Sequence, residues 1–225
     1  MRTIVAALAL ATALFAGQAA AQNIDTMAAA SGTFGIFGVP DTATYGQTIT
    51  IPAGVTQLTS FGFEMQSVPS TVVFRGEVYL WDDANNRATG PALYESAVRS
   101  TTGATPQLIT FSPPGGLTVI PGQKYVIFAT TSRDQAGASG AGNWAASYSN
   151  PYAGGDLVFI NNGANPADWT SGPWSVDATI DFGFVANFNA PPAPVPTLSE
   201  WAMILFGLAL AGGAVVMVQR RRLAA

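Results

Sequence analysis

The side chains best suited to binding chemistry gather between residues 143 and 174. This stretch holds three of the five tryptophans, two tyrosines and several asparagines. An aromatic face can stack on the C–H groups of a sugar, and an amide can bond pairs of hydroxyls. We therefore predict a candidate carbohydrate-binding platform, although the usual burial of large aromatics favours the alternative that they fill a core. Tyr79 and Trp81, which lie on the polar face of a predicted strand, are added to this set. The candidate carbohydrate-binding residues are Tyr79, Trp81, Trp144, Tyr148, Trp169 and Trp174.

Acid–base chemistry in this chain would have to rest on carboxylates. The sequence has no His and no Cys, which excludes Ser-His-Asp triads, thiol catalysis, Cys/His zinc sites and disulfides. A glycosidase needs two carboxyl groups about 5 to 10 Å apart, and no motif singles out such a pair. We therefore predict a non-enzymatic protein with no catalytic residue, no metal site and no cofactor. An enzymatic alternative would draw on Glu64, Glu77, Glu95, Asp156 and Asp181.

One loop offers oxygen ligands of the kind that calcium prefers. Asp82, Asp83, Asn85 and Asn86 follow one another closely in the sequence. Calcium takes six to eight oxygens, and one short loop supplies only part of that set. Asp and Asn also tolerate the backbone angles of tight turns, so the favoured interpretation is a hairpin turn.

Period-two alternation predicts the strands that would position these groups. In residues 74–81, Phe74, Val78 and Leu80 fall on one face, and the polar and aromatic residues between them fall on the other. Segments rich in Gly, Pro, Asn and Asp separate the predicted strands. The pattern predicts an all-β fold over residues 22–189, an antiparallel two-sheet sandwich that is jelly-roll-like. The predicted strands span residues 45–51, 61–65, 74–81, 92–99, 107–111, 124–131, 157–160 and 180–188.

The charge pattern excludes one class of partner. Charged residues make up only 10% of the 225 residues, with 9 basic and 13 acidic side chains. The basic side chains of the central region are scattered and form no stripe. Nucleic acid is therefore not an expected partner.

The first 21 residues have the three parts of a secretory signal peptide. Arg2 precedes an apolar run, and Ala19 and Ala21 supply the small residues that signal peptidase requires. We predict cleavage after Ala21, which leaves Gln22 as the first residue. The alternative, an uncleaved anchor, is disfavoured because the run is short and ends in a cleavage site. The general secretion machinery and signal peptidase are therefore expected partners.

A second apolar run spans residues 201–218 and carries no charge. A helix of this length is roughly 27 Å long, close to the ~30 Å hydrocarbon core of a bilayer. Arg220, Arg221 and Arg222 follow directly, and the positive-inside rule places them in the cytoplasm. The sequence thus predicts one membrane span, with residues 22–189 outside.

The entry to this span is also distinctive. Residues 190–196 are rich in proline and predict an extended spacer that is accessible to a peptidase. Thr197 and Glu200 fit a helix capping box. The run at the junction is Val195, Pro196, Thr197, Leu198, Ser199, Glu200 and Trp201. With the apolar span and the arginine cluster, this run resembles the IPTL-CTERM sorting signal, a relative of the PEP-CTERM signals of exported bacterial proteins. The resemblance covers about residues 195–222, with Val in place of Ile at the first position.

The resemblance implies a fate for the chain. Such tails are recognised by an exosortase-type membrane peptidase that uses its own Cys, so this chain would be substrate rather than enzyme. Processing would release or re-anchor the protein at the cell surface or in the extracellular matrix, often in bacteria that make extracellular polysaccharide. The alternative is a plain C-terminal anchor. Most of residues 33–188 also resembles the β-sandwich domains common in exported proteins with such tails, a family likeness that implies fold and no activity.

Overall fold

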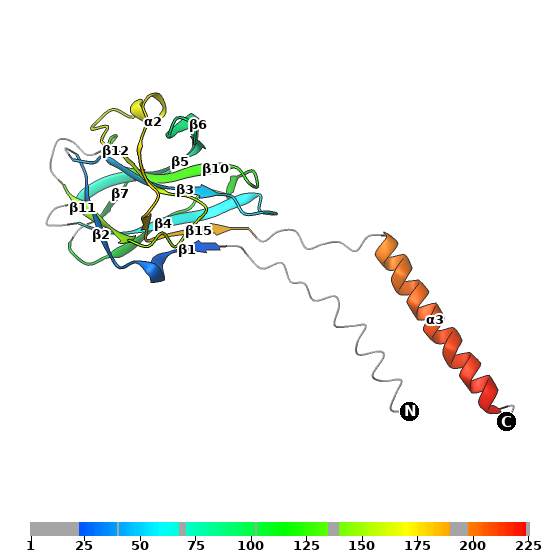
Figure 1. Ribbon diagram of the computed structural model, residues 1–225. Coiled ribbons are helices and arrows are strands. Elements are labelled where there is room, and N and C mark those ends of the chain that lie inside the picture. Colours follow the sequence, from blue (N-terminus) through cyan, green and yellow to red (C-terminus); the bar gives the residue numbers. More distant parts are fainter. Residues whose placement is uncertain are drawn as a thin grey trace. The chain divides into compact units, whose positions relative to one another are not determined.

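The computed structural model describes residues 23–39, 41–67, 71–101, 103–134, 140–189 and 198–223 (Figure 1). The described residues belong to two separate units, a β domain within residues 20–191 and a C-terminal helix. The helix, α3, spans Leu198–Leu223.

The β domain contains two antiparallel sheets. Sheet A has the strand order β1-β15-β4-β11-β14, with β2 paired to β11, and with β8 and β9 paired to β4. Its strands are β1 (Asn23–Asp25), β2 (Gly32–Phe37), β4 (Gln57–Ser67), β8 (Gln107–Phe111), β9 (Leu117–Thr118), β11 (Gly142–Ser147), β14 (Asp181–Phe182) and β15 (Phe184–Phe188).

Sheet B has the order β13-β12-β3-β10-β5-β6, with β7 paired to β5. Two short helical turns accompany the sheets, η2 (Met27–Ala29) beside β1 and α2 (Asp168–Ser171) before β13. The strands of sheet B are β3 (Thr44–Thr50), β5 (Val72–Asp82), β6 (Arg87–Glu95), β7 (Arg99–Thr101), β10 (Lys124–Thr130), β12 (Leu157–Ile160) and β13 (Ser175–Asp177).

The predicted fold class is confirmed. The chain passes repeatedly from one sheet to the other, and the strands pair antiparallel, as expected for a jelly-roll-like sandwich. Two strand predictions are wrong in their bounds. The strand expected over residues 180–188 is divided at Gly183 into β14, which pairs with β11, and β15, which pairs with β4. We expected a turn at Gly90 and Pro91 and a strand over 92–99, whereas β6 runs through both residues and ends at Glu95. A register shift against β5 and the position of β6 at the sheet edge accommodate the proline, which has no N–H to donate.

The main core lies between the two sheets and is dominated by aromatic rings. Phe61 and Phe63 from β4 alternate with outward residues, as period-two patterning requires, and both are fully buried. Phe74 and Val78 from β5 approach them from the opposite sheet. A Cβ at Gly76 would overlap the Phe111 ring, so the glycine allows the two sheets to approach closely.

A second apolar cluster covers the outer face of sheet B. Tyr79 and Trp81 project outward from β5 and pack with Phe128 of β10. Trp169 and Trp174 from the segment that holds α2 close over them, and Figure 1 shows α2 beside β6 over this sheet. The polar face predicted for β5 is therefore covered by a loop rather than exposed to solvent.

Candidate functional site

The predicted aromatic platform does not form. Five of its six members are buried: Tyr79, Trp81, Trp144, Trp169 and Trp174. The indole of Trp144 lies in the main core, with its ring centroid 4.5 Å from that of Phe63. The alternative that these aromatics fill a core is therefore correct for the five, because their faces already contact other rings. Tyr148 alone is exposed, at 55%, and its hydroxyl donates to the Thr33 carbonyl oxygen at 2.8 Å.

A network of charged side chains lies beside the second cluster. Arg133 donates from Nε to Oε1 of Glu77 at 3.2 Å, and its guanidinium lies 5.0 Å from the centroid of the Trp169 ring. Arg75 pairs with Glu95 at 2.8 Å and with Asp134 at 2.6 Å. Glu77 and Glu95 lie opposite each other on β5 and β6, so the two arginines separate acids that would otherwise repel each other.

Glu77 is the most perturbed carboxyl group of this network. Its side chain is fully buried, and Oε2 has no hydrogen-bond partner among the described residues. Burial raises the pKa of Glu77 to about 7, while Arg133 opposes that rise and Glu95 adds to it. The covering loop leaves this carboxyl group with no access to an external ligand.

The remaining candidate acids are dispersed. Asp181 is buried at the sheet junction, where Gln47 Nε2 and the Tyr152 backbone N–H each donate to it at 2.7 Å. Burial raises the pKa of Asp181 in spite of these donors. Asp156 lies just before β12, and its backbone pairs with Thr48 of β3. Glu64 projects from the outer face of β4, away from the other acids.

The acidic loop forms a hairpin turn between β5 and β6. Asp82 accepts hydrogen bonds from the backbone N–H groups of Ala84 and Asn85 and from the Asn85 amide at 2.7 Å. Asp83 pairs with Lys124 at 2.8 Å, and Asn86 takes a φ of 49°. The oxygens that calcium would need therefore serve the turn itself. Across the described ranges, no group of three or more acidic side chains could hold a metal ion.

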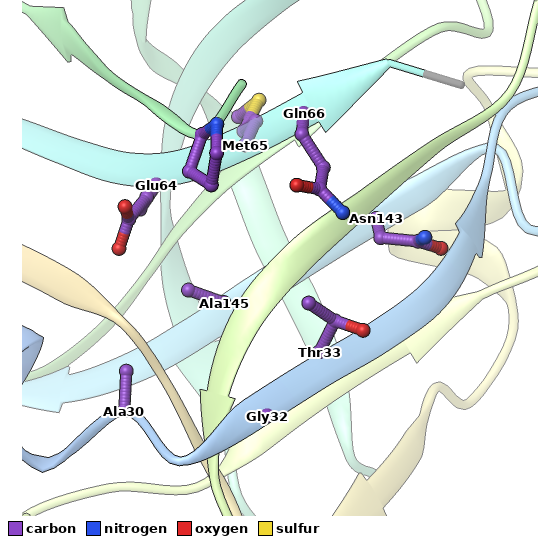
Figure 2. Close-up of a pocket in the computed structure, with 9 residues that line it drawn as sticks. Ala30, Gly32, Thr33, Glu64, Met65, Gln66, Asn143 and Ala145 are labelled. Carbon is purple, nitrogen blue, oxygen red and sulfur yellow. The ribbon is translucent and has the colours of Figure 1, made fainter. Parts of the chain in front are cut away.

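A shallow hollow on the outer face of sheet A was not expected. We call it the sheet-A hollow; it encloses about 200 Å³. Figure 2 shows Gln66 from β4 beside Asn143 from β11, with Thr33 of β2 and Glu64 of β4 facing the same space. Its lining residues are Ala30, Gly32, Thr33, Glu64, Met65, Gln66, Pro106, Asn143 and Ala145.

The C-terminal helix is the other candidate feature. It is 26 residues long, and Arg220, Arg221 and Arg222 lie in its last turn. Its apolar residues occur on every side, and Met203, Leu205 and Phe206 each expose more than 60% of their surface. Such a helix is stable only where an apolar medium surrounds it. Residues 202–223 are long and apolar enough to span a membrane by length and composition.

The other predicted tail and leader residues are only partly described. Leu198, Ser199, Glu200 and Trp201 begin α3. Six predicted site residues lie outside the described ranges: Ala19, Ala21 and Gln22 of the leader, and Val195, Pro196 and Thr197 of the motif. The capping bond predicted for Thr197 therefore also lies outside them.

The comparison with family models decides what this tail resembles. Residues 193–222 match the IPTL-CTERM motif. The match includes the proline-rich approach, the apolar helix and the arginine cluster, so the resemblance noted in the sequence is confirmed. An IPTL-CTERM motif together with an apolar helix fits an exported, membrane-tethered protein with a β domain.

The other comparisons add little. No curated protein sequence matches the chain. Among solved structures, a chain in "Structure of infectious bursal disease virus Gx strain" is 18% identical, with a TM-score of 0.31. The match covers 85% of this chain and 47% of the viral chain, so this chain spans about half the length of that one. A likeness this low carries no argument about fold or function.

Proposed function

We propose that this chain is a non-enzymatic surface or matrix protein whose β domain is displayed outside the cell by its IPTL-CTERM tail, and that an exosortase-type peptidase processes that tail. The observation that carries the proposal is α3, an apolar helix ending in three arginines within the matched residues. Twenty-six helical residues extend about 39 Å, enough to cross a hydrocarbon core of about 30 Å.

Charge supports the proposed orientation. The arginines at the C-terminal end favour the cytoplasmic side, which directs the chain before α3 outward. They also lie at the negative end of the helix dipole, where cations are stabilised. The β domain, with no disulfide to form, closes its core by burial alone.

The β domain supports display rather than catalysis. Its most perturbed carboxyl groups, Glu77 and Asp181, are buried and already hydrogen-bonded within the fold. In this proposal the domain supplies a stable, exported surface, and the chain is the substrate of the peptidase. The leader is removed by signal peptidase after Ala21.

The test is to locate both ends of the mature protein. Intact-mass measurement and terminal sequencing of the native protein should give a chain that begins at Gln22 and lacks α3. Alanine replacement of Val195, Pro196, Thr197 and Leu198 should give a chain that begins at Gln22 but still ends at Ala225. The matched control replaces Pro191 and Pro192, which lie before the motif, and should be processed normally. A mature wild-type chain that still ends at Ala225 would reduce the tail to an anchor.

A further inference from the structure

The sheet-A hollow presents three polar side chains that the protein itself does not use. Glu64, Gln66 and Asn143 are half-buried, yet their side chains form no hydrogen bond with the part of the chain that the structure describes. Elsewhere the domain satisfies comparable groups internally. Asn187 on the same sheet, for example, donates to the Ser60 hydroxyl at 2.9 Å.

Strand register brings these side chains together. Gln66 and Asn143 lie directly opposite each other where β4 pairs with β11. Glu64 lies two residues before Gln66, and therefore on the same face of β4. Paired and same-face neighbours lie about 5 to 8 Å apart, so one small molecule can reach all three.

Small lining residues, among them Gly32 and Ala145, leave the hollow open, and two nearby glycines shape the strands around it. Gly183 bridges the two strands, since its N–H donates to the Ala145 carbonyl and its carbonyl accepts from the Glu64 N–H. Beside Asn143, a Cβ at Gly35 would overlap the amide oxygen, so only a glycine there lets the Asn143 side chain lie across β2. The backbone is thus arranged to hold the amides at the surface.

The chemistry of these groups defines the ligand class. Two amides supply donors and acceptors in pairs, and the carboxylate of Glu64 accepts two further hydrogen bonds. Vicinal hydroxyls are the matching partners, because each hydroxyl both donates and accepts. None of the described residues that line the hollow is basic, and the carboxylate of Glu64 repels anions. A volume of about 200 Å³ is below the ~300 Å³ at which drug-sized pockets begin, which suits one sugar ring in an open site.

We propose that the sheet-A hollow binds one residue of an uncharged polysaccharide through Glu64, Gln66 and Asn143. Pro106 supplies apolar contact, and the described lining residues include no aromatic ring. A few hydrogen bonds, each of modest net strength in an open site, give a Kd on the order of 1 mM for a single site. This site is independent of the tail and does not depend on its processing.

The test is affinity gel electrophoresis of the full chain in a polyoxyethylene detergent, which has no sugar headgroup to compete. The probes are dextran and hydroxyethylcellulose as neutral polysaccharides and alginate as an anionic one. At least one neutral probe should retard the wild-type protein, and alginate should not. Replacing both amides (Gln66→Ala with Asn143→Ala) should weaken retention at least tenfold.

Two further variants separate binding from folding. Ala145→Phe leaves all three polar groups in place but fills the hollow, and it should abolish retention. Asn161→Ala removes an exposed amide next to β12 in the other sheet and should bind like the wild type. Thermal unfolding followed by tryptophan fluorescence confirms that each variant folds. The proposal is overturned if neither neutral probe retards the wild type, if alginate is the better ligand, or if the folded double variant and the folded Ala145→Phe protein bind unchanged.

Discussion

Glu77 gives the sharpest test of the physical reasoning about the β domain. Its carboxyl group is fully buried under the loop that carries Trp169. Oε1 is bonded to Arg133, and Oε2 finds no hydrogen-bond partner in the described part of the chain. The charged groups around it are Arg133, Arg75 and Glu95, and the Tyr79 hydroxyl lies in the same environment. Burial outweighs the arginines and raises the pKa of Glu77 from 4.5 to about 7.

The sign of the stability effect follows from proton linkage. Between pH 4.5 and 7 the folded protein binds this proton more tightly than the unfolded chain does, so this contribution to stability falls as pH rises. It is fully present below pH 4.5 and is lost once the pH exceeds about 7. A shift of this size corresponds to about 3 kcal/mol, since one pKa unit is worth about 1.4 kcal/mol.

The perturbation is Glu77→Gln, which keeps the shape and removes the titration. Urea unfolding of the full chain in detergent, followed by tryptophan fluorescence, should be measured from pH 4 to pH 8.5. As the pH rises from 4 to 8.5, we expect the free energy of unfolding of the variant to increase by about 3 kcal/mol relative to that of the wild type. Arg133→Gln should extend the pH-dependent loss of stability to higher pH and so enlarge it, because it removes the charge that opposes the rise in the pKa of Glu77.

The control is Asp83→Asn, which removes a carboxylate whose side chain is 63% exposed. It gives the change in the free energy of unfolding that follows from losing one surface charge, and we expect this change to be small at every pH. If the stability of Glu77→Gln and that of the wild type run parallel from pH 4 to pH 8.5, the assignment of a buried, proton-binding Glu77 is wrong.

Two other predictions follow from the packing and from the tail. Trp169→Ala should lower the free energy of unfolding by about 3 to 5 kcal/mol, because it leaves a cavity over sheet B, removes the ring beside Arg133 and breaks the 3.1 Å hydrogen bond to Thr44. Trp169→Phe should lower it clearly less, and equal losses for the two variants in urea unfolding would contradict this account. Replacing Arg220, Arg221 and Arg222 with Glu should weaken retention of the C-terminal end in the cytoplasm, so that protease added to spheroplasts removes a C-terminal epitope tag, whereas Lys replacements should keep the tag protected.

Local patterning predicted much of the fold. The alternation in β5 correctly placed Phe74, Val78 and Leu80 on the core side, because successive side chains of a strand point to opposite faces of the sheet. The bounds of β8 and β12 agree with the prediction, since turn residues flank both. The apolar tail was equally clear, because a charge-free run of that length has few other uses.

The sequence of a strand does not show which distant segment will cover its outer face. The outward residues of β5 looked solvent-exposed in sequence, and their cover comes from Trp169 and Trp174, about ninety residues further along. β11 was missed because its small residues, such as Ala145 and Ala146, blur the alternation. The sheet-A hollow depends on the pairing of Gln66 with Asn143, a register that no local signal encodes.

The position of β15 within sheet A constrains the order in which the chain can mature. β4 is complete by residue 67, but its neighbour β15 begins only at residue 184. The chain is synthesised from its amino end. For most of synthesis β4, with Phe61 and Phe63 on its apolar face, therefore has one edge that is not yet paired with β15. Such half-made sheets aggregate unless a chaperone shields them. Sheet A can be completed only once β15 is available, shortly before α3 is made. Folding of the β domain and membrane tethering through α3 therefore occur at nearly the same time.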